Sequence, residues 1–413
     1  MIVLNEMKQK NLQKAIVDKV KIEELLTRGV DTVYPTKEAL REVLLSGKCL
    51  RLYLGIDPTS PHLHLGHAGS ILMLRKFQDL GHEVILLFGD FTARIGDPTD
   101  KLAARKPLTK EEVAENLTTF KKQASKILNF TGTNAARVKF NASWHSELTF
   151  EKVIQLASHF TVQQMLERSM FQERLKAGKP IGLHEFLYPL MQGYDSVAMD
   201  VDLEVGGTDQ TFNMLAGRTL MKIMTGREKF VITNRLLEDP TTGKKMSKTE
   251  GTLVNLDDEP NDMFGKVMAL PDELIVHMME LSTMMSSPRI EELKKKLSAG
   301  ENPRDIKLVV AKEIVSLYHS PKTAEEASEE WLRVFSKKEK PEDAPKLNLE
   351  KKSLPLLELL LLAGIESKGE ARRLIEQGAV KINDVIKKDT NSVVTLTTKD
   401  IIRVGKHRFF EIK

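Results

Sequence analysis

Residues 51–67 read RLYLGIDPTSPHLHLGH, and this stretch decides the fold class of the chain. Its first seven residues alternate leucine or isoleucine with other side chains, which predicts a β-strand. The apolar residues between positions 68 and 80 recur at helical spacing and stop at Gly81, so they predict a helix soon after the strand. A strand that leads into a helix is the first part of a strand–helix–strand unit, the building block of parallel sheets.

The same alternation of strands and helices continues along the chain. Residues 83–91 read EVILLFGDF, an apolar run typical of a parallel strand that is buried on both faces. Thr109 and Glu112 have the spacing of a capping box, which predicts a helix from there to about Leu128. Further strands are expected at Arg137–Phe140, Asp202–Val205 and Phe230–Asn234. The expected fold class is therefore α/β, a Rossmann-like parallel sheet wrapped by helices, with a site at the carboxyl ends of its strands.

The pattern changes after residue 260. Residues 261–334 have helical spacing without convincing strands, so they predict an all-α domain. Residues 335–352 are charged, contain proline and have little to bury, as expected of a linker. Residues 353–413 combine two helical patterns with short strands and predict a small α+β domain. Residues 1–260 are expected to form the Rossmann-like domain that carries the site, with helices in residues 1–45.

The composition excludes several classes of protein. Of the 413 residues, 41% are hydrophobic and 29% are charged, which excludes intrinsic disorder for most of the chain. No apolar run approaches the roughly 20 residues that cross a bilayer, so we expect no membrane partner. Cys49 is the only cysteine, which excludes an internal disulfide or a cysteine-built zinc site and favours a cytoplasmic protein.

The net charge of +4 is concentrated near the end of the sequence. Residues 353–413 hold eleven Lys and Arg against eight Asp and Glu. A basic C-terminal domain on a nearly neutral body indicates a polyanion as partner. A solvated basic surface without a partner is the alternative.

Two histidines occur where the first strand gives way to its helix. His64 and His67 are three residues apart with Gly66 between them. The free N–H groups and the dipole of a helix N-terminus favour an anion there, and imidazoles can donate hydrogen bonds to phosphate oxygens. A pair of surface histidines without function is the alternative, and the position after a strand favours a phosphate site.

A second motif, KKMSKT, spans Lys244–Thr249 between Gly243 and Gly251. Lysines on a glycine-bordered loop can place positive charge over a triphosphate, although a solvated basic turn would look the same. Together, about 180 residues apart and in this order, the two motifs resemble the HIGH and KMSKS signatures of the class I aminoacyl-tRNA synthetases.

A third pattern narrows the resemblance. Tyr188, Gln192 and Asp195 are spaced to share one face of a helix, which Pro189 is expected to bend. This YxxxQxxD pattern is similar to that of the tyrosyl-tRNA synthetases. The similarity extends over most of residues 30–413 through these stretches: LYLGIDPT at 52–59, GDFTARIGDP at 89–98, NASW at 141–144 and VGGTDQ at 205–210. It also implies that the C-terminal domain is an RNA-binding module like that of a ribosomal protein of the S-four type.

The resemblance implies a site for tyrosine, ATP and tRNA. The tyrosine-binding residues would be Tyr53 and Asp195 at the phenol, Asp97, Tyr188 and Gln192 at the ammonium group, and Gln210 near the carboxylate. The ATP-binding residues would be Gly55, His64, His67, Gly207, Asp209 and Lys248. The catalytic residues would be Thr59, His64, His67, Lys101, Arg105, Lys245 and Lys248. The RNA-binding residues would be Lys368, Arg372, Arg373, Arg403, Lys406 and Arg408.

The resemblance also implies partners and leaves alternatives. ATP would enter as a substrate with Mg²⁺, no metal would be bound by the protein itself, and the chain would form a homodimer. A tryptophanyl-tRNA synthetase, a small-molecule nucleotidyltransferase and a non-catalytic RNA-binding relative are the alternatives. The sequence departs from the family pattern at Leu65, Thr249 and Glu204. Glu204 replaces the glutamine of some relatives, and its charge calls for a lysine or arginine that the sequence does not identify.

Overall fold

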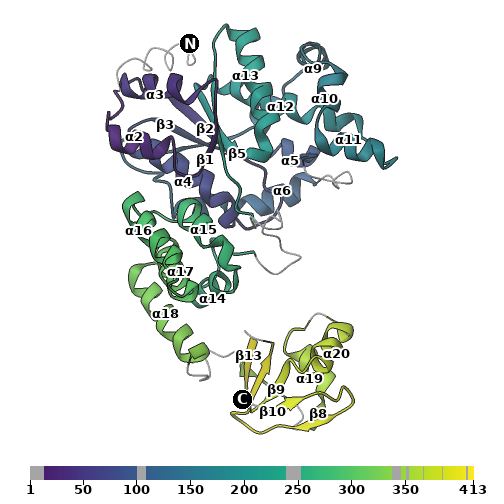
Figure 1. Cartoon of the computed structure of the whole chain (residues 1–413). Coiled ribbons are helices and arrows are strands. Elements are labelled where there is room, and N and C mark those ends of the chain that lie inside the picture. Colours follow the sequence, from purple (N-terminus) through teal and green to yellow (C-terminus); the bar gives the residue numbers. More distant parts are fainter. Residues whose placement is uncertain are drawn as a thin grey trace. The chain divides into compact units, whose positions relative to one another are not determined.

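The computed structural model describes residues 14–99, 108–238, 253–336, 346–349, 353–365, 367–383, 385–405 and 408–413. The chain divides into two compact units (Figure 1). Unit 1 comprises Met1–Glu259 and Lys266–Pro321, and unit 2 comprises Pro260–Gly265 and Lys322–Lys413. The four-part division expected from the sequence stays a prediction; in the structure most of the central helices group with unit 1.

The described strands of unit 1 form a six-stranded sheet in the order β1-β6-β5-β2-β3-β4. They are β1 (Val30–Tyr34), β2 (Arg51–Ile56), β3 (Glu83–Phe88), β4 (Arg137–Phe140), β5 (Leu203–Gly207) and β6 (Phe230–Asn234). All neighbours pair in parallel except β1 and β6. The order from β2 runs outward to β3 and β4 on one side and to β5 and β6 on the other, so the sheet has a switch point between β2 and β5.

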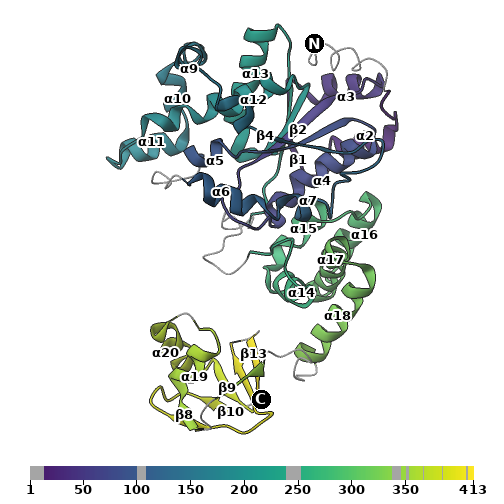
Figure 2. The same ribbon diagram turned by 180° about the vertical axis from the view of Figure 1, so that it is seen from behind.

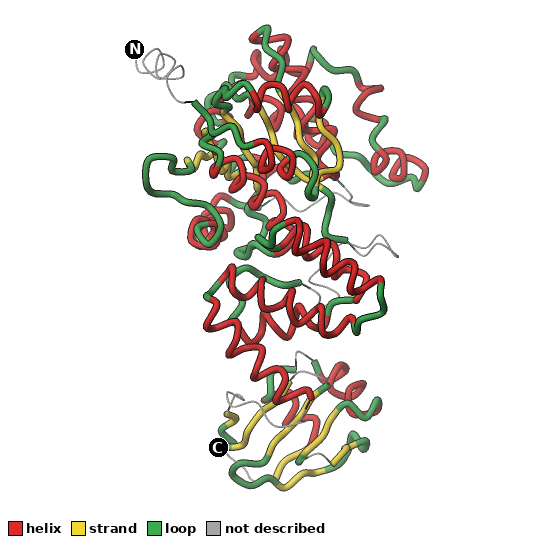
Figure 3. The backbone as a smooth tube through the Cα atoms, turned by 60° about the vertical axis from the view of Figure 1, so that its left-hand side comes forward, coloured by secondary structure: helices red, strands yellow, loops and turns green. Residues whose placement is uncertain are grey.

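Helices lie on both sides of this sheet (Figures 2 and 3). Those before β5 are α2 (Lys19–Leu25), α3 (Lys37–Leu45), α4 (Leu65–Asp79), α5 (Thr92–Ile95), α6 (Lys110–Leu117), α7 (Phe120–Ala124), α8 (Ala142–His145), α9 (Phe150–Ala157), α10 (Val162–Leu166), α11 (Ser169–Lys176), η1 (Leu183–Phe186) and α12 (Tyr188–Met199). Those after β5 in unit 1 are η2 (Thr208–Gln210), α13 (Thr211–Thr225), the end of α14 (Pro260–Ala269), η3 (Asp272–Leu274), α15 (Ile275–Ser282), α16 (Ser287–Ser298) and α17 (Pro303–Tyr318). Side chains of β2 and β3 alternate between the two faces, and Tyr53, Ile85 and Leu87 cluster with Met199 of α12.

The structure confirms the mixed α/β class and the parallel strands expected from the sequence, with three differences. A strand, β1, forms an antiparallel sheet edge inside the segment expected to be helical. The helix expected from Thr109 to about Leu128 is two helices, α6 and α7, and in the break between them the Thr119 hydroxyl donates to Pro61 O at 2.8 Å. Pro189 lies in the first turn of α12, where a backbone N–H has no acceptor within the helix, so proline removes no helical hydrogen bond there.

Unit 2 has a separate sheet and core. Its helices are most of α18 (Pro321–Ser336), α19 (Leu356–Leu362) and α20 (Lys368–Glu376), and its strands are β7 (Lys346–Leu347), β8 (Ser353–Pro355), β9 (Val380–Ile382), β10 (Val385–Lys387), β11 (Val393–Thr395), β12 (Ile401–Val404) and β13 (Arg408–Ile412). The core packs leucines of α19 and Ile375 of α20 on the sheet of order β10-β9-β12-β13-β7. β7 belongs to the segment expected to be a linker, and it pairs in parallel with β13.

Candidate active site

A cavity of about 300 Å³ lies at the carboxyl ends of β2 and β5, at the switch point of the sheet. Twelve of the side chains or glycines that the sequence assigns to the site line it: Tyr53, Gly55, Thr59, His64, His67, Asp97, Tyr188, Gln192, Asp195, Gly207, Asp209 and Gln210. The structure therefore brings into one cavity all the expected tyrosine-binding residues and the expected ATP-binding residues other than Lys248.

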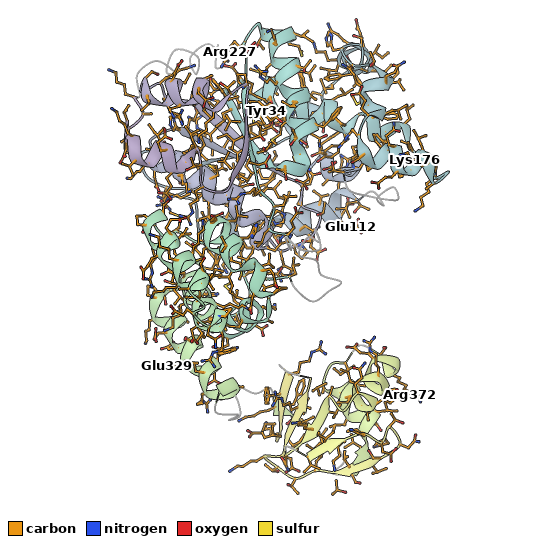
Figure 4. The ribbon with its side chains drawn as sticks, in the orientation of Figure 1. Tyr34, Glu112, Lys176, Arg227, Glu329 and Arg372 are labelled. Atoms are coloured by element: carbon orange, nitrogen blue, oxygen red, sulfur yellow. The ribbon has the colours of Figure 1, made fainter. Side chains whose placement is uncertain are left out.

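Five of the other expected site residues lie outside the described residues: Lys101, Arg105, Lys245, Lys248 and Lys406. Those on α20 and on the β12–β13 hairpin of unit 2 are Lys368, Arg372, Arg373, Arg403 and Arg408. The side chains from α20 are exposed, as Figure 4 shows for Arg372. Their part in RNA binding stays a prediction.

Asp195 on α12 is 2% exposed and is held by three donors. Trp144 Nε1 at 2.8 Å and His145 Nε2 at 2.7 Å both contact its Oδ1, whereas Asn141 Nδ2 lies 3.3 Å from its Oδ2. Burial raises the pKa of Asp195, and the hydrogen bonds from His145, Trp144 and Asn141 oppose that rise. Because a carboxylate oxygen accepts about two hydrogen bonds, Oδ1 is filled and Oδ2 can accept one more.

The wall beside Asp195 contains a buried ion pair. Glu204 on β5 pairs with Lys229, the residue before β6, and both side chains are nearly inaccessible. Gln192 Nε2 donates to Glu204 Oε1 at 3.1 Å. Lys229 is therefore the cation that Glu204 requires, and the sequence did not identify it. Behind the same wall, Ser196 Oγ lies 3.0 Å from the Tyr53 hydroxyl.

A second acidic group in the cavity is centred on Asp57. Tyr188 Oη donates to Asp57 Oδ2 at 2.8 Å, and Thr92 Oγ1 donates to Asp57 Oδ1 at 2.7 Å. Burial raises the pKa of Asp57 to about 7 against the effect of these two donors. Gly89 makes room for this carboxylate, because a Cβ there would lie 1.9 Å from Asp57 Oδ1. Gln210 Nε2 donates to Asp97 Oδ2 at 2.8 Å, which links the two sides of the cavity.

The two histidines occupy the N-terminus of α4. His64 is its N-cap: Gly66 N donates to His64 Nδ1 at 3.2 Å, and His64 N donates to His67 Nδ1 at 3.2 Å. Burial lowers the pKa of His64 to about 4 and holds the pKa of His67 well below its usual range. Both rings are therefore neutral near pH 7, and since each Nδ1 accepts, each Nε2 carries the proton. The two Nε2–H groups are donors at a helix N-terminus, which suits phosphate oxygens.

The segment after the KKMSKT motif is tied to this helix start. The motif itself lies outside the described residues. Leu65 N donates to Val254 O at 3.0 Å, and Leu256 N donates to Leu63 O at 2.8 Å. Val254 is five residues beyond Thr249. The backbone that follows the motif thus pairs with the turn that carries His64.

Comparison with known proteins decides the family. The profile described as "tRNA synthetases class I (W and Y)" matches residues 46–336, and that of a "Tyrosine--tRNA ligase SYY-like C-terminal domain" matches residues 337–412. The chain is 44% identical over 408 residues to the tyrosine–tRNA ligase of Carboxydothermus hydrogenoformans, covering 96% of this chain and 98% of that protein. It is 43% identical to that of Thermotoga maritima, covering 94% and 96%. This chain belongs to the tyrosyl-tRNA synthetases.

Solved tyrosyl-tRNA synthetases share its fold. The Archaeoglobus fulgidus enzyme complexed with L-tyrosine is 24% identical, with a TM-score of 0.59, over 75% of this chain and all of that one. A C-terminally truncated mitochondrial enzyme from Aspergillus nidulans is 22% identical, with a TM-score of 0.64, over 80% of this chain and 97% of that one. A tryptophanyl-tRNA synthetase and a non-catalytic relative are not favoured, because the near-full-length relatives are tyrosine–tRNA ligases.

The sequence missed several residues that shape this synthetase site: Asp57, Thr92, Asn141, Trp144, His145, Ser196 and Lys229. Asp57 and Asn141 directly follow β2 and β4, so the rule that sites lie at carboxyl strand ends could have found them. Lys229 precedes β6 instead, and no sequence signal joins it to Glu204. No helix among the described residues is long and apolar enough to cross a membrane.

Proposed function

We propose that the cavity of unit 1 forms tyrosyl-adenylate and then passes tyrosine to tRNA, the tyrosine–tRNA ligase reaction of the family. In the first step the tyrosine carboxylate attacks the α-phosphorus of ATP and expels pyrophosphate. In the second step a hydroxyl of the terminal ribose of the tRNA attacks the adenylate carbonyl and releases AMP. No protein nucleophile is needed, so catalysis rests on positioning and on stabilisation of charge.

The observation that carries this proposal is Asp195, a buried carboxylate with one oxygen left to accept, in the same cavity as His64 and His67. Oδ2 of Asp195 would accept the phenol proton of tyrosine, and the Tyr53 hydroxyl would donate to the phenol oxygen. Phenylalanine would cover Oδ2 of Asp195 without supplying a proton for it to accept, which costs free energy and disfavours the wrong substrate.

The other end of the amino acid would meet the acidic group around Asp57. Tyr188 donates its proton to Asp57, so its oxygen is left to accept from the ammonium group of tyrosine. Asp97 and the amide oxygen of Gln192 would accept the other ammonium protons. Gln210 would lie near the carboxylate that attacks ATP.

ATP would bind at the N-terminus of α4. The Nε2–H groups of His64 and His67, with Thr59, would donate to its phosphates, and the helix dipole would favour their charge. Gly55 would leave space beside the nucleotide, and Gly207 and Asp209 would contact the ribose.

Positive charge on the departing pyrophosphate would come from four residues outside the described ones: Lys101, Arg105, Lys245 and Lys248. They would stabilise charge as it develops in the transition state. Mg²⁺ would arrive with ATP as part of the substrate, bound through phosphate oxygens, with no metal held by the protein alone.

Unit 2 would bind the tRNA through the exposed basic side chains of α20 and through the β12–β13 hairpin. Their charges suit phosphate contacts and recognition of folded RNA by shape. Deletion of residues 353–413 should spare adenylate formation and impair aminoacylation. Unchanged aminoacylation of tRNA would refute this assignment.

We also propose a cytoplasmic homodimer, in which one tRNA bridges two protomers. Large apolar side chains are exposed on neighbouring elements of unit 1, with exposed fractions of 80% for Phe150, 54% for Ile154, 63% for Val162, 51% for Leu175 and 80% for Leu183. Exposed apolar side chains grouped in this way are typical of a protein interface. A Phe150→Asp/Leu183→Asp variant should sediment as a monomer, and an unchanged mass would refute this interface.

The single cysteine supports the proposed cytoplasmic location.

Exchange of labelled pyrophosphate into ATP, measured with each amino acid in turn, tests the central proposal. Tyrosine alone should support rapid exchange, because the cavity must form an adenylate before tRNA is needed. Exchange driven by tryptophan, or exchange with no amino acid preference, would contradict it.

A further inference from the structure

Glu204 and Lys229 form a buried ion pair at the wall of the cavity, and the reaction described above gives neither residue a role. Lys229 is 0% exposed and Glu204 is 1% exposed. Glu204 lines the cavity, whereas Lys229 and Ser196 do not and so lie behind its wall. Two buried charges cost much free energy to desolvate, and a pair of apolar side chains of equal volume would often stabilise the fold as well.

The backbone makes dedicated space for this lysine. A Cβ on Gly217 of α13 would lie 2.6 Å from Lys229 Nζ and 2.8 Å from Ser196 Oγ. Tyr53 is the direct neighbour of Glu204 across the β2–β5 pair. The ammonium group, the carboxylate and the Tyr53 ring are therefore packed against one another at one point of the sheet.

The pair fixes the direction of the Gln192 amide. A carboxylate can only accept hydrogen bonds, so Glu204 must face the NH₂ group of Gln192, in line with the 3.1 Å contact. The amide oxygen of Gln192 then faces away from Glu204, where it can accept from a substrate ammonium group. A glutamine at position 204 could either donate or accept, and it would leave the Gln192 amide free to turn.

The pair also holds the Tyr53 hydroxyl in place. Lys229 can only donate, and its Nζ lies 2.8 Å from Ser196 Oγ, so it fills one lone pair of that oxygen. Ser196 Oγ in turn donates to Glu204 Oε2 at 3.4 Å and lies 3.0 Å from Tyr53 Oη. The ion pair therefore fixes Ser196, and Ser196 fixes the position of the Tyr53 oxygen.

We infer that Lys229 is a positioning residue for tyrosine recognition, which it serves by orienting Gln192 through Glu204 and Tyr53 through Ser196. The inference rests on the proposed function. The contacts run from the ammonium of Lys229 through Ser196 to the Tyr53 hydroxyl, which would meet the substrate phenol beside Asp195. A phenol hydroxyl can form hydrogen bonds with both Tyr53 and Asp195, whereas a bare phenyl ring cannot.

The test uses pyrophosphate exchange by the full chain, with KM for tyrosine and for ATP measured separately. Lys229→Met leaves the Glu204 carboxylate buried without a counter-ion and is the variant most at risk of misfolding. The Glu204→Gln/Lys229→Met double variant has no buried charge at either position. We expect the double variant to raise the tyrosine KM by about 10-fold or more, the value of one hydrogen bond to a charged group, while the ATP KM changes less than about 2-fold.

Ser196→Ala tests the contact with Tyr53 separately from the contact with Gln192, and it changes no charge. It should lower the ratio of kcat/KM for tyrosine over phenylalanine by about 10-fold, because Ser196 holds the Tyr53 hydroxyl and only the phenol can form a hydrogen bond with that hydroxyl. Lys307→Met is the matched control: Lys307 is 6% exposed, donates to Leu270 O at 2.6 Å and does not line the cavity. It should lower the melting temperature and leave the tyrosine KM unchanged.

A purely structural pair would give a different result. A folded double variant with the parent tyrosine KM, together with a Ser196→Ala variant of unchanged tyrosine preference, would overturn the inference while the proposed function stands. Absence of tyrosine-dependent exchange in the parent protein would overturn both.

Discussion

The two ends of the cavity differ in their chemistry. At the proposed tyrosine end lie three acids, the buried Asp195 and Glu204 and the half-buried Asp57, whose partners come from the protein itself. At the proposed nucleotide end, His64 and His67 are neutral rings held by backbone N–H groups of one helix start. The first end is a network of charges and hydrogen bonds. The second offers N–H donors and a helix dipole, and under the proposal its full positive charges come from residues outside the described ones.

Because of this difference, we expect changes at the two ends of the cavity to alter different kinetic constants. Changes in the acid network should alter discrimination among amino acids and the KM for tyrosine. Changes at the helix start should alter kcat, because phosphate charge grows in the transition state.

The largest effect is expected from Asp195→Ala. It removes the phenol acceptor and leaves the donors of Trp144 and His145 unpaired, so kcat/KM for tyrosine should fall by more than about 100-fold. The ATP KM should change less than about 2-fold, as measured by pyrophosphate exchange. Asp202→Ala is the control, since Asp202 is also buried but does not line the cavity. Equal losses in tyrosine and ATP binding would show that the two ends of the cavity do not act separately, which would contradict the comparison.

A smaller effect is expected at the nucleotide end from His64→Asn. Asparagine keeps an N-cap acceptor for α4, so the fold is preserved while the Nε2–H donor is lost. The kcat of adenylate formation should fall by about 100-fold, the usual value of one donor to a developing charge, with the tyrosine KM unchanged. Pre-steady-state formation of adenylate measures this directly. A variant with parent kcat would show that this ring does not contact the phosphates.

A third variant, His145→Phe, sharpens the account of the tyrosine end. It keeps a ring but removes the donor that lies 2.7 Å from Asp195 Oδ1. Oδ1 then has room for another donor, and the carboxylate is less firmly held, so kcat/KM for tyrosine should fall by about 10-fold. His82→Phe is the control, because His82 is buried outside the cavity. Parent activity in both variants would mean that Trp144 and Asn141 hold Asp195 without His145.

The smallest effect concerns stability and has opposite signs at the two ends. The pKa of His64 falls from 6.5 in the unfolded chain to about 4 in the folded one, so the stability it contributes is present above pH 6.5 and is lost on acidification. The pKa of Asp57 rises from 3.8 to about 7, so its contribution is present below pH 4 and is lost as the pH rises towards 7.

Urea unfolding at several pH values checks these signs. When the pH is lowered from 7 to 5, the free energy of unfolding should fall by about 1 to 2 kcal/mol less in His64→Asn than in the parent. When the pH is raised from 5 to 7.5, the free energy of unfolding should fall less in Asp57→Asn than in the parent. If the free energy of unfolding depends on pH equally in the parent and in both variants, neither group has the shifted pKa that its burial implies.

Much of the fold, and the placement of several residues in the cavity, could be predicted from local patterns in the sequence. Alternating apolar residues predicted the parallel strands, and spacing along one helix predicted that Gln192 and Asp195 lie together. The partners of these residues could not be predicted in the same way. Lys229 reaches Glu204 only because Gly217, on a helix between them in sequence, leaves room for its ammonium group. His145 reaches Asp195 only through the parallel pairing of β3 with β4, which places α8 beside the cavity wall.

A crystal structure with a non-hydrolysable tyrosyl-adenylate analogue tests the central claim most directly. The account predicts the phenol oxygen within hydrogen-bonding distance of Asp195 Oδ2 and Tyr53 Oη, with the phosphate-mimicking group beside Nε2 of His64 or His67. A ligand whose phenol lies away from Asp195, or whose phosphate mimic lies outside the helix start of α4, would contradict it.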